Sequence, residues 1–198
     1  MQTTRHLPLF PLHTVLFPGV PLPLRVFEER YKLLVKRCLE EDGALGIVLI
    51  RSGAEVGGPA VPHDVGTLAR ITQVDKRSDG TLHLATVGER RFRIRSIDDS
   101  RPYAVGDVEL LDEGQPDVPD RLLALVREEF TQYVQVLRRL ARQAERDVPI
   151  PEGGLELSYA VAANLQIRRA EQQSLLEDPP ARRLAHERHL LHRELTIV

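Results

Sequence analysis

The stretch Leu7–Tyr31, LPLFPLHTVLFPGVPLPLRVFEERY, decides the fold of the first half of the chain. Prolines at positions 8, 11, 18, 21 and 23 each remove a backbone N–H and fix φ, so no helix can run through this segment. What remains is extended backbone with large aliphatic and aromatic side chains, and Pro18-Gly19 indicates a turn within it. We therefore predict two paired strands that start a β-rich domain and lead into a helix.

Composition sets the broad class of the protein. The 198 residues suit one large domain or two small ones, and 42% hydrophobic with 28% charged residues is ordinary for a globular chain. A formal net charge of -2 gives no overall attraction to nucleic acid or to an anionic membrane. The single cysteine excludes an internal disulfide, and no apolar run approaches the ~20 residues that span a bilayer. These features predict a soluble, cytoplasmic protein with no membrane association.

Periodicity organises the rest of the first half. A helix is predicted over Phe27–Glu41, because apolar side chains recur there at helical spacing. Its expected buried face contains Phe27, Tyr31, Leu34, Val35 and Cys38. Asp79-Gly80 predicts a hairpin, and Ser52–Val65 is rich in glycine and proline and predicts a loop. The predicted strands are Ala44–Arg51, Gly66–Arg77, Thr81–Ile97 and Tyr103–Leu111.

The pattern then changes from strands to helices. Asp112–Asp120 has the acidic and proline-containing composition of a linker, and apolar residues follow with a 3.6-residue period from Pro119 to Ala144. Further helices are predicted over Leu155–Ile167, Ala170–Glu177 and Ala181–Leu195. The fold class is therefore α+β, with a β-rich domain at residues 1–111 and a helical domain at residues 112–198.

The sequence contains no convincing catalytic, nucleotide or metal site. Gly53 to Gly58 has the glycine spacing of a phosphate-binding loop, but Pro59 and Ala60 stand where the lysine and hydroxyl residue belong. A G-x-S-x-G elbow and a recognisable serine-lysine pair are also missing. The last helix carries three histidines among several arginines, which indicates a solvated or partly packed face rather than a metal site. We predict a protein that is not an enzyme and needs no cofactor or metal.

An arginine stripe is the one candidate for binding nucleic acid. Arg91, Arg93 and Arg95 alternate along one predicted strand and are expected to share a face. No aromatic residue lies among them to stack bases, so an ordinary solvated strand face explains the pattern better. We therefore do not expect nucleic acid to be a partner.

Several sequence blocks resemble one family in order and spacing. They include LPLFPL (7–12), VLFPG (15–19), LPLRVFEERY (22–31), DGTLHLATVGERRFRI (79–94) and EQQSLLEDPPARRL (171–184). Together they resemble the N-terminal, substrate-binding domain of the Lon ATP-dependent proteases, although Gln172 replaces the lysine usual in that family. The resemblance implies a PUA-like pseudobarrel followed by a helical bundle. It also leads us to expect a stand-alone homologue that lacks the ATPase and protease domains.

The resemblance implies a non-enzymatic module that binds unfolded or partly folded polypeptides, with an ATPase or protease supplied in trans as a further partner. The expected binding patch is the tip of the opening stretch, Leu16, Phe17, Pro18 and Val20. Glu29 and Arg30 are expected to rim it, and Phe17→Asp is expected to abolish binding without unfolding the domain. Alternatively Phe17 and Val20 fill the barrel, where large apolar side chains usually lie. Two other functions stay open, nucleic-acid binding through the arginine stripe and an adaptor or small-ligand role.

Overall fold

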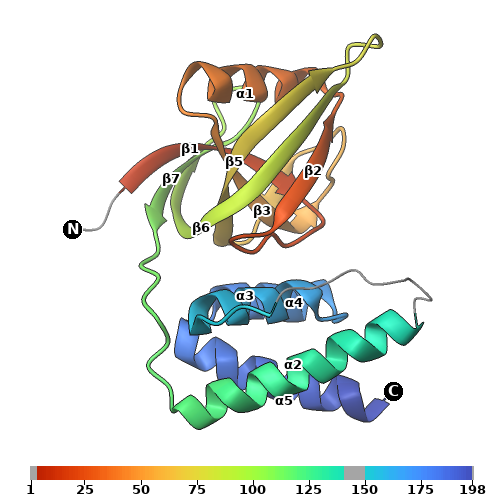
Figure 1. Ribbon diagram of the computed structural model, residues 1–198. Helices are drawn as coiled ribbons and strands as arrows, with labels where there is room; N and C mark the ends of the chain where they lie inside the picture. The colour runs from red at the N-terminus through yellow and green to blue at the C-terminus, as the bar shows by residue number, and fades with distance from the viewer. Residues whose placement is uncertain (1–3, 141–149, 198) are drawn as a thin grey trace. The chain divides into compact units, whose positions relative to one another are not determined.

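The computed structural model describes residues 4–140 and 150–197, and the chain divides into two compact units, Met1–Asp112 and Glu113–Val198 (Figure 1). The predicted boundary, after residue 111, lies one residue before this division. The first unit consists of strands with one helix, and the second consists of helices. The predicted α+β class is therefore confirmed.

Unit 1 contains seven strands and a single helix within its described residues. In chain order they are β1 (Thr4–Leu12), β2 (Pro21–Val26), α1 (Glu29–Glu40), β3 (Ala44–Gly53), β4 (Ala60–Pro62), β5 (Val65–Lys76), β6 (Leu82–Asp98) and β7 (Val105–Leu110).

The strands of unit 1 close into a barrel. Neighbouring strands follow the order β1-β7-β6-β5-β3, and β1 also pairs with β3, which returns the sheet to its start. The β1–β3 pairing is parallel and the other pairings are antiparallel. Closure removes most exposed strand edges, the feature of a sheet most prone to unwanted pairing. Two strands lie off the closed path: β2, which pairs with β6, and the short β4, which pairs with β3.

The opening stretch forms two strands as predicted, but they do not pair with each other in the registers observed. β1 pairs with β7 through residues 4–8 and with β3 through residues 9–12, whereas β2 pairs with β6. Long-range pairing of this kind leaves no local signal, since the partners lie more than 30 residues away in the chain. The predicted 52–65 loop also contains a short strand, β4, which pairs with β3.

Helix α1 supplies much of the barrel core. Tyr31, Leu34, Val35 and Cys38 are buried as predicted and cluster with apolar residues of β1, β2 and β3. Burial raises the pKa of the Cys38 thiol to about 12, so it is a packing residue and not a nucleophile. The prediction was wrong for Phe27, which precedes the helix and is 48% exposed. The helix begins only at Glu29, because Glu28 has extended backbone angles.

Unit 2 consists of α2 (Asp120–Leu140), α3 (Gly154–Asn164), α4 (Arg169–Glu177) and α5 (Pro180–Ile197) within the described residues. α5 packs against α2, α3 and α4 and so holds the unit together. The predicted apolar stripe of the first helix is buried at Val126, Phe130, Tyr133 and Val134. Its predicted continuation to Ala144 lies outside the described residues.

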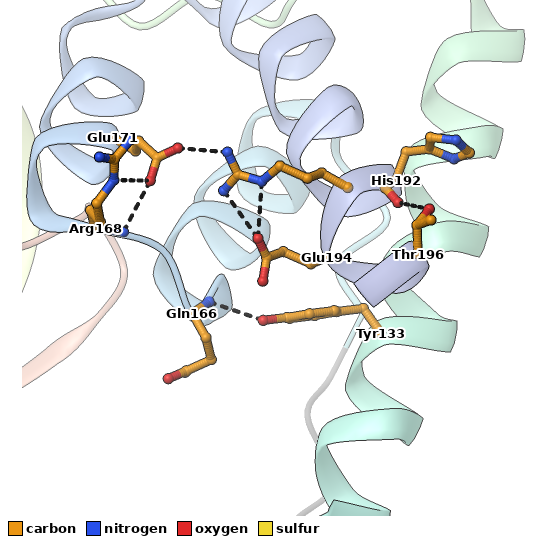
Figure 2. Close-up of polar contacts among 8 residues, drawn as sticks. Tyr133, Gln166, Arg168, Glu171, His192, Glu194 and Thr196 are labelled. Carbon is orange, nitrogen blue, oxygen red and sulfur yellow. Dashed lines mark hydrogen bonds and ion pairs between the residues drawn. The ribbon is translucent and has the colours of Figure 1, made fainter. Parts of the chain in front are cut away.

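An ion-pair cluster joins α4 to α5 (Figure 2). Arg193 on α5 contacts Glu171 on α4 at 2.7 Å and its neighbour Glu194 at 3.0 Å. Glu171 also accepts hydrogen bonds from the backbone N–H and the side chain of Arg168, which caps the start of α4. The hydrogen bond from Arg193 is the main cause that lowers the pKa of Glu171 to about 2.

Replacing Glu171 with glutamine is expected to lower the free energy of unfolding of unit 2 by about 1–2 kcal/mol, because charge-assisted hydrogen bonds are lost. A carboxylate whose pKa is lowered on folding stabilises above its ordinary pKa of 4.5, and this contribution is lost as the pH falls towards 2. Urea unfolding of variant and wild type should therefore converge over that range. Glu128→Gln, at an exposed position of α2, is the matched control. An unchanged difference at low pH would contradict the assignment.

Candidate polypeptide-binding groove

The tip of the opening stretch is held inside unit 1. Leu16, Phe17 and Pro18 are buried, and Phe17 is only 2% exposed, whereas Val20 is partly buried. Three hydrogen bonds hold the tip against β5 and β6: Thr67 Oγ1 donates to Leu16 O at 2.6 Å, Gly19 N to Gly88 O at 2.8 Å and Gly88 N to Val20 O at 3.0 Å.

Close approach of the backbone explains why the tip fits against β6. A Cβ atom at Gly88 would lie 2.5 Å from the carbonyl oxygen of Phe17, nearer than real Cβ contacts come. A buried Phe17 cannot offer its ring to a partner, so the expected exposed patch of Leu16, Phe17 and Pro18 is not present. The alternative, in which Phe17 fills the barrel, agrees with its burial.

An apolar groove of about 370 Å³ opens instead beside β2. Its lining includes Phe10, Leu12 and Thr14 and the five consecutive residues Leu22 to Val26. Phe27 and Val56 line the same groove and are 48% and 55% exposed. Exposed large apolar side chains gathered at one concave site are typical of binding surfaces.

Tyr31 lies at the junction of the groove with helix α1. Its ring stacks on Phe10 with 4.3 Å between centroids, and the guanidinium of Arg30 lies 4.5 Å from the Tyr31 centroid. Burial raises the pKa of the Tyr31 hydroxyl. The groove therefore has a rigid aromatic base that stays uncharged at neutral pH.

The loop between β3 and β4 is fastened over one end of the groove by polar contacts. The carboxylate of Glu28 accepts from Gly57 N at 3.2 Å and pairs with Arg30, which donates to Gly58 O at 3.1 Å. The carboxylate of Glu55 accepts from His13 N at 2.7 Å. These contacts place Val56 at the groove.

Neither predicted rim residue, Glu29 or Arg30, lines the groove. Arg30 is partly buried and ties the loop to α1, whereas Glu29 is exposed and pairs with Lys32 at 2.8 Å. The sequence interpretation missed Phe27 and Val56. Val56 carried one usable signal, since it is a large apolar residue in a loop of small and polar residues.

The arginine stripe is not a shared exposed face. Arg91 is buried, Arg93 is partly buried, and only Arg95 is exposed, where it pairs with Glu109. Phe92 and Ile94 do share one apolar cluster as the alternation predicts, but the arginine side of the strand is covered at Arg91 and partly covered at Arg93. The three side chains are therefore not arranged to contact phosphates together.

Two further kinds of feature are absent from the described residues. No helix within residues 4–140 and 150–197 is long and apolar enough to cross a membrane. In the same residues, no three histidine, cysteine, aspartate or glutamate side chains are grouped to hold a metal ion.

Comparison with known proteins gives consistent results. The family model for the ATP-dependent protease La (LON) substrate-binding domain matches residues 6–193. Lon protease 2 of Syntrophobacter fumaroxidans is 32% identical over 98% of this chain, which covers 25% of that protein. Lon protease of Flavobacterium johnsoniae is 30% identical over 86% of this chain, which covers 22% of that protein. The chain thus spans about a quarter of the length of these curated relatives.

Solved structures agree with this result. A Lon N-terminal domain protein from Xanthomonas campestris has a TM-score of 0.69 and 31% identity, covering 91% of this chain and 95% of that one. The N-terminal domain of Lon protease from the Mycobacterium avium complex has a TM-score of 0.64 and 18% identity, and the match covers 95% of this chain and 98% of that one. The two proteins therefore share the fold. The family match covers both units and nearly all of the chain, and the protein therefore belongs to the LON substrate-binding domain family.

Proposed function

We propose that unit 1 binds unfolded or partly folded polypeptides, and that extended apolar segments occupy the groove beside β2. The observation that carries this proposal is the pair of exposed side chains, Phe27 and Val56, on one apolar groove. A groove of about 370 Å³ falls in the range of about 300–1,000 Å³ typical of binding pockets. Membership of a substrate-binding family supports the same role.

The proposed role is binding without chemistry in this chain. The family match is to a substrate-binding domain, and the groove's polar residues already bind the loop that borders it. An ATPase or protease, acting on the bound polypeptide, is the partner that this role implies. Such a partner would unfold or cleave the segment that the groove retains.

Phe27→Asp is expected to weaken binding of an unfolded client at least tenfold, because an aromatic anchor is replaced by a charge. The full-length protein would be tested for binding of a permanently unfolded client by fluorescence anisotropy and for suppression of client aggregation. Leu39→Asp is the matched control, since Leu39 is 51% exposed on α1 and does not line the groove.

The outcome is decisive in both directions. Loss of binding in Phe27→Asp with normal binding in Leu39→Asp supports the groove. Equal binding by both variants and the wild type would remove the groove from the proposal, and no binding by the wild type would overturn the function itself.

A further inference from the structure

The hydrogen-bonding direction of β2 defines which groups it offers to the groove. Gly88 N donates to Val20 O, which sets the alternation for the strand that follows. In the β2–β6 register, Leu22, Leu24 and Val26 then exchange backbone hydrogen bonds with β6. Pro21 and Pro23 could not be the residues that exchange hydrogen bonds with β6, because they have no N–H to donate. The carbonyls of Pro21, Pro23 and Arg25 therefore point to the other edge.

That other edge faces the groove. Side chains alternate between the two faces of a strand, so a cavity on one face is lined by every second residue. The groove is lined by Leu22, Pro23, Leu24, Arg25 and Val26 in succession. A cavity lined by consecutive residues lies along the edge of a strand, where the backbone is accessible.

The edge is unusual in offering acceptors almost without donors. Its three carbonyls, from Pro21, Pro23 and Arg25, are accompanied by a single N–H, that of Arg25. An ordinary edge strand presents both groups alternately and can pair with any other edge. Here a partner strand finds acceptors for its own N–H groups but little to satisfy its carbonyls.

The side chains around the groove add negative charge. Glu28 and Glu55 both line it, and Glu28 already pairs with Arg30. The contact found for the Glu55 carboxylate within the described residues is the backbone N–H of His13, which leaves its charge unbalanced by a cation. Arg25 is the one cation among the lining residues, against the two carboxylates. Carboxylates and carbonyls together favour a donor-rich, basic partner.

We propose that β2 is a one-sided docking edge that selects extended polypeptide segments through their backbone N–H groups, with an apolar side chain in the groove and a basic side chain beside Glu55. The proposal rests on the polypeptide-binding function above and adds the feature that selects the client. The paired prolines serve two purposes. They prevent the edge from pairing with copies of itself, yet leave acceptors for a client.

The first test is a scan of amide-to-ester replacements in one synthetic peptide that binds the full-length protein. Each ester removes one N–H, and measured affinity should fall about three- to tenfold at every second position and stay unchanged between. Uniform insensitivity in a peptide that binds would overturn the docking edge while leaving polypeptide binding intact. Absence of binding by every peptide and by unfolded clients would instead overturn the function.

The second test adds a donor to the edge. Pro23→Ala supplies an N–H beside the groove, so it should tighten peptide binding and promote self-association detectable by analytical ultracentrifugation. Glu55→Gln keeps an oxygen for His13 N and should reduce, by a few-fold, the preference for a lysine-containing peptide over its glutamate counterpart. Glu40→Gln, which lies outside the groove lining, is the matched control. Unchanged affinity in Pro23→Ala and unchanged preference in Glu55→Gln would contradict the proposal.

Discussion

Replacing Phe17 with aspartate is expected to unfold the barrel of unit 1 rather than to remove a binding contact. Phe17 is 2% exposed, and its backbone lies directly against Gly88 of β6. Loss of a buried phenylalanine ring costs about 3–5 kcal/mol, and burying a carboxylate without a partner adds several more. The sum approaches the whole stability of a typical domain, about 5–15 kcal/mol.

The matched control is the same substitution at Phe27, whose ring is half exposed. Hydrogen exchange of the full-length chain, read by mass spectrometry over β5 and β6, should show lost protection in Phe17→Asp and retained protection in Phe27→Asp. Client binding should be lost in both variants, so only the exchange data separate misfolding from a damaged groove. If Phe17→Asp keeps the hydrogen-exchange protection of the wild type over β5 and β6, the tip at residues 16–20 is accessible and again becomes a candidate binding site.

Local patterns were sufficient for most elements of the fold. Proline positions excluded a helix from the opening stretch, Asp79-Gly80 marked the β5–β6 hairpin, and apolar periodicity located α1, α2 and α5. The hairpin is confirmed in detail, since Gly80 has a φ of 79° and Thr81 N donates to Asp79 Oδ1 at 2.9 Å. Each of these signals lies within a few residues of the feature that it predicts.

The candidate groove could not be predicted because the residues that line it meet through long-range pairing. Phe10 and Leu12 belong to β1, which pairs with β3, while Leu22 to Val26 belong to β2, which pairs with β6. Helical spacing alone placed Phe27 on the buried face of α1, and the extended conformation of Glu28 reversed that placement. The acceptor-rich edge has a sequence signal in Pro21 and Pro23, but its direction depends on the register with β6.

A buried polar cluster in unit 2 was also hidden from the sequence, where the last helix appeared solvated or partly packed. Arg183 and Glu187 on α5 are both 0% exposed. Arg183 Nε donates to Ser158 Oγ at 2.7 Å, Ser158 Oγ donates to Glu187 Oε1 at 2.9 Å, and the guanidinium lies 4.1 Å from the Tyr159 ring centroid. Among the described residues, Arg183 Nη1, Arg183 Nη2 and Glu187 Oε2 have no hydrogen-bond partner. The cluster is therefore only partly satisfied.

At a pH above the raised pKa of Glu187, where its carboxylate is ionised, Arg183→Met is expected to lower the free energy of unfolding of unit 2 by about 3–5 kcal/mol, because Glu187 then loses its cation in a buried site. The double variant Arg183→Met, Glu187→Met should recover most of that loss and can exceed the wild type, since both desolvation costs disappear together. Urea unfolding followed by far-UV circular dichroism, with hydrogen exchange over α5 in the full-length chain, measures both values. Additive losses in the double variant would mean that the cluster stabilises the fold more than its burial costs.

The pH dependence gives an independent test of the same cluster. Burial raises the pKa of Glu187 well above its ordinary value of 4.5, despite the opposing charge of Arg183. Because the folded state then binds a proton that the unfolded state has released, this group favours folding most below pH 4.5 and less as the pH rises towards the folded pKa. Glu187→Gln keeps an acceptor for Ser158 but cannot titrate, so unit 2 should lose that decline. If the free energy of unfolding of Glu187→Gln falls by the same amount as the pH rises, another group causes the fall. If the free energy of unfolding of the wild type rises instead over this range, the pKa of Glu187 is not raised by burial.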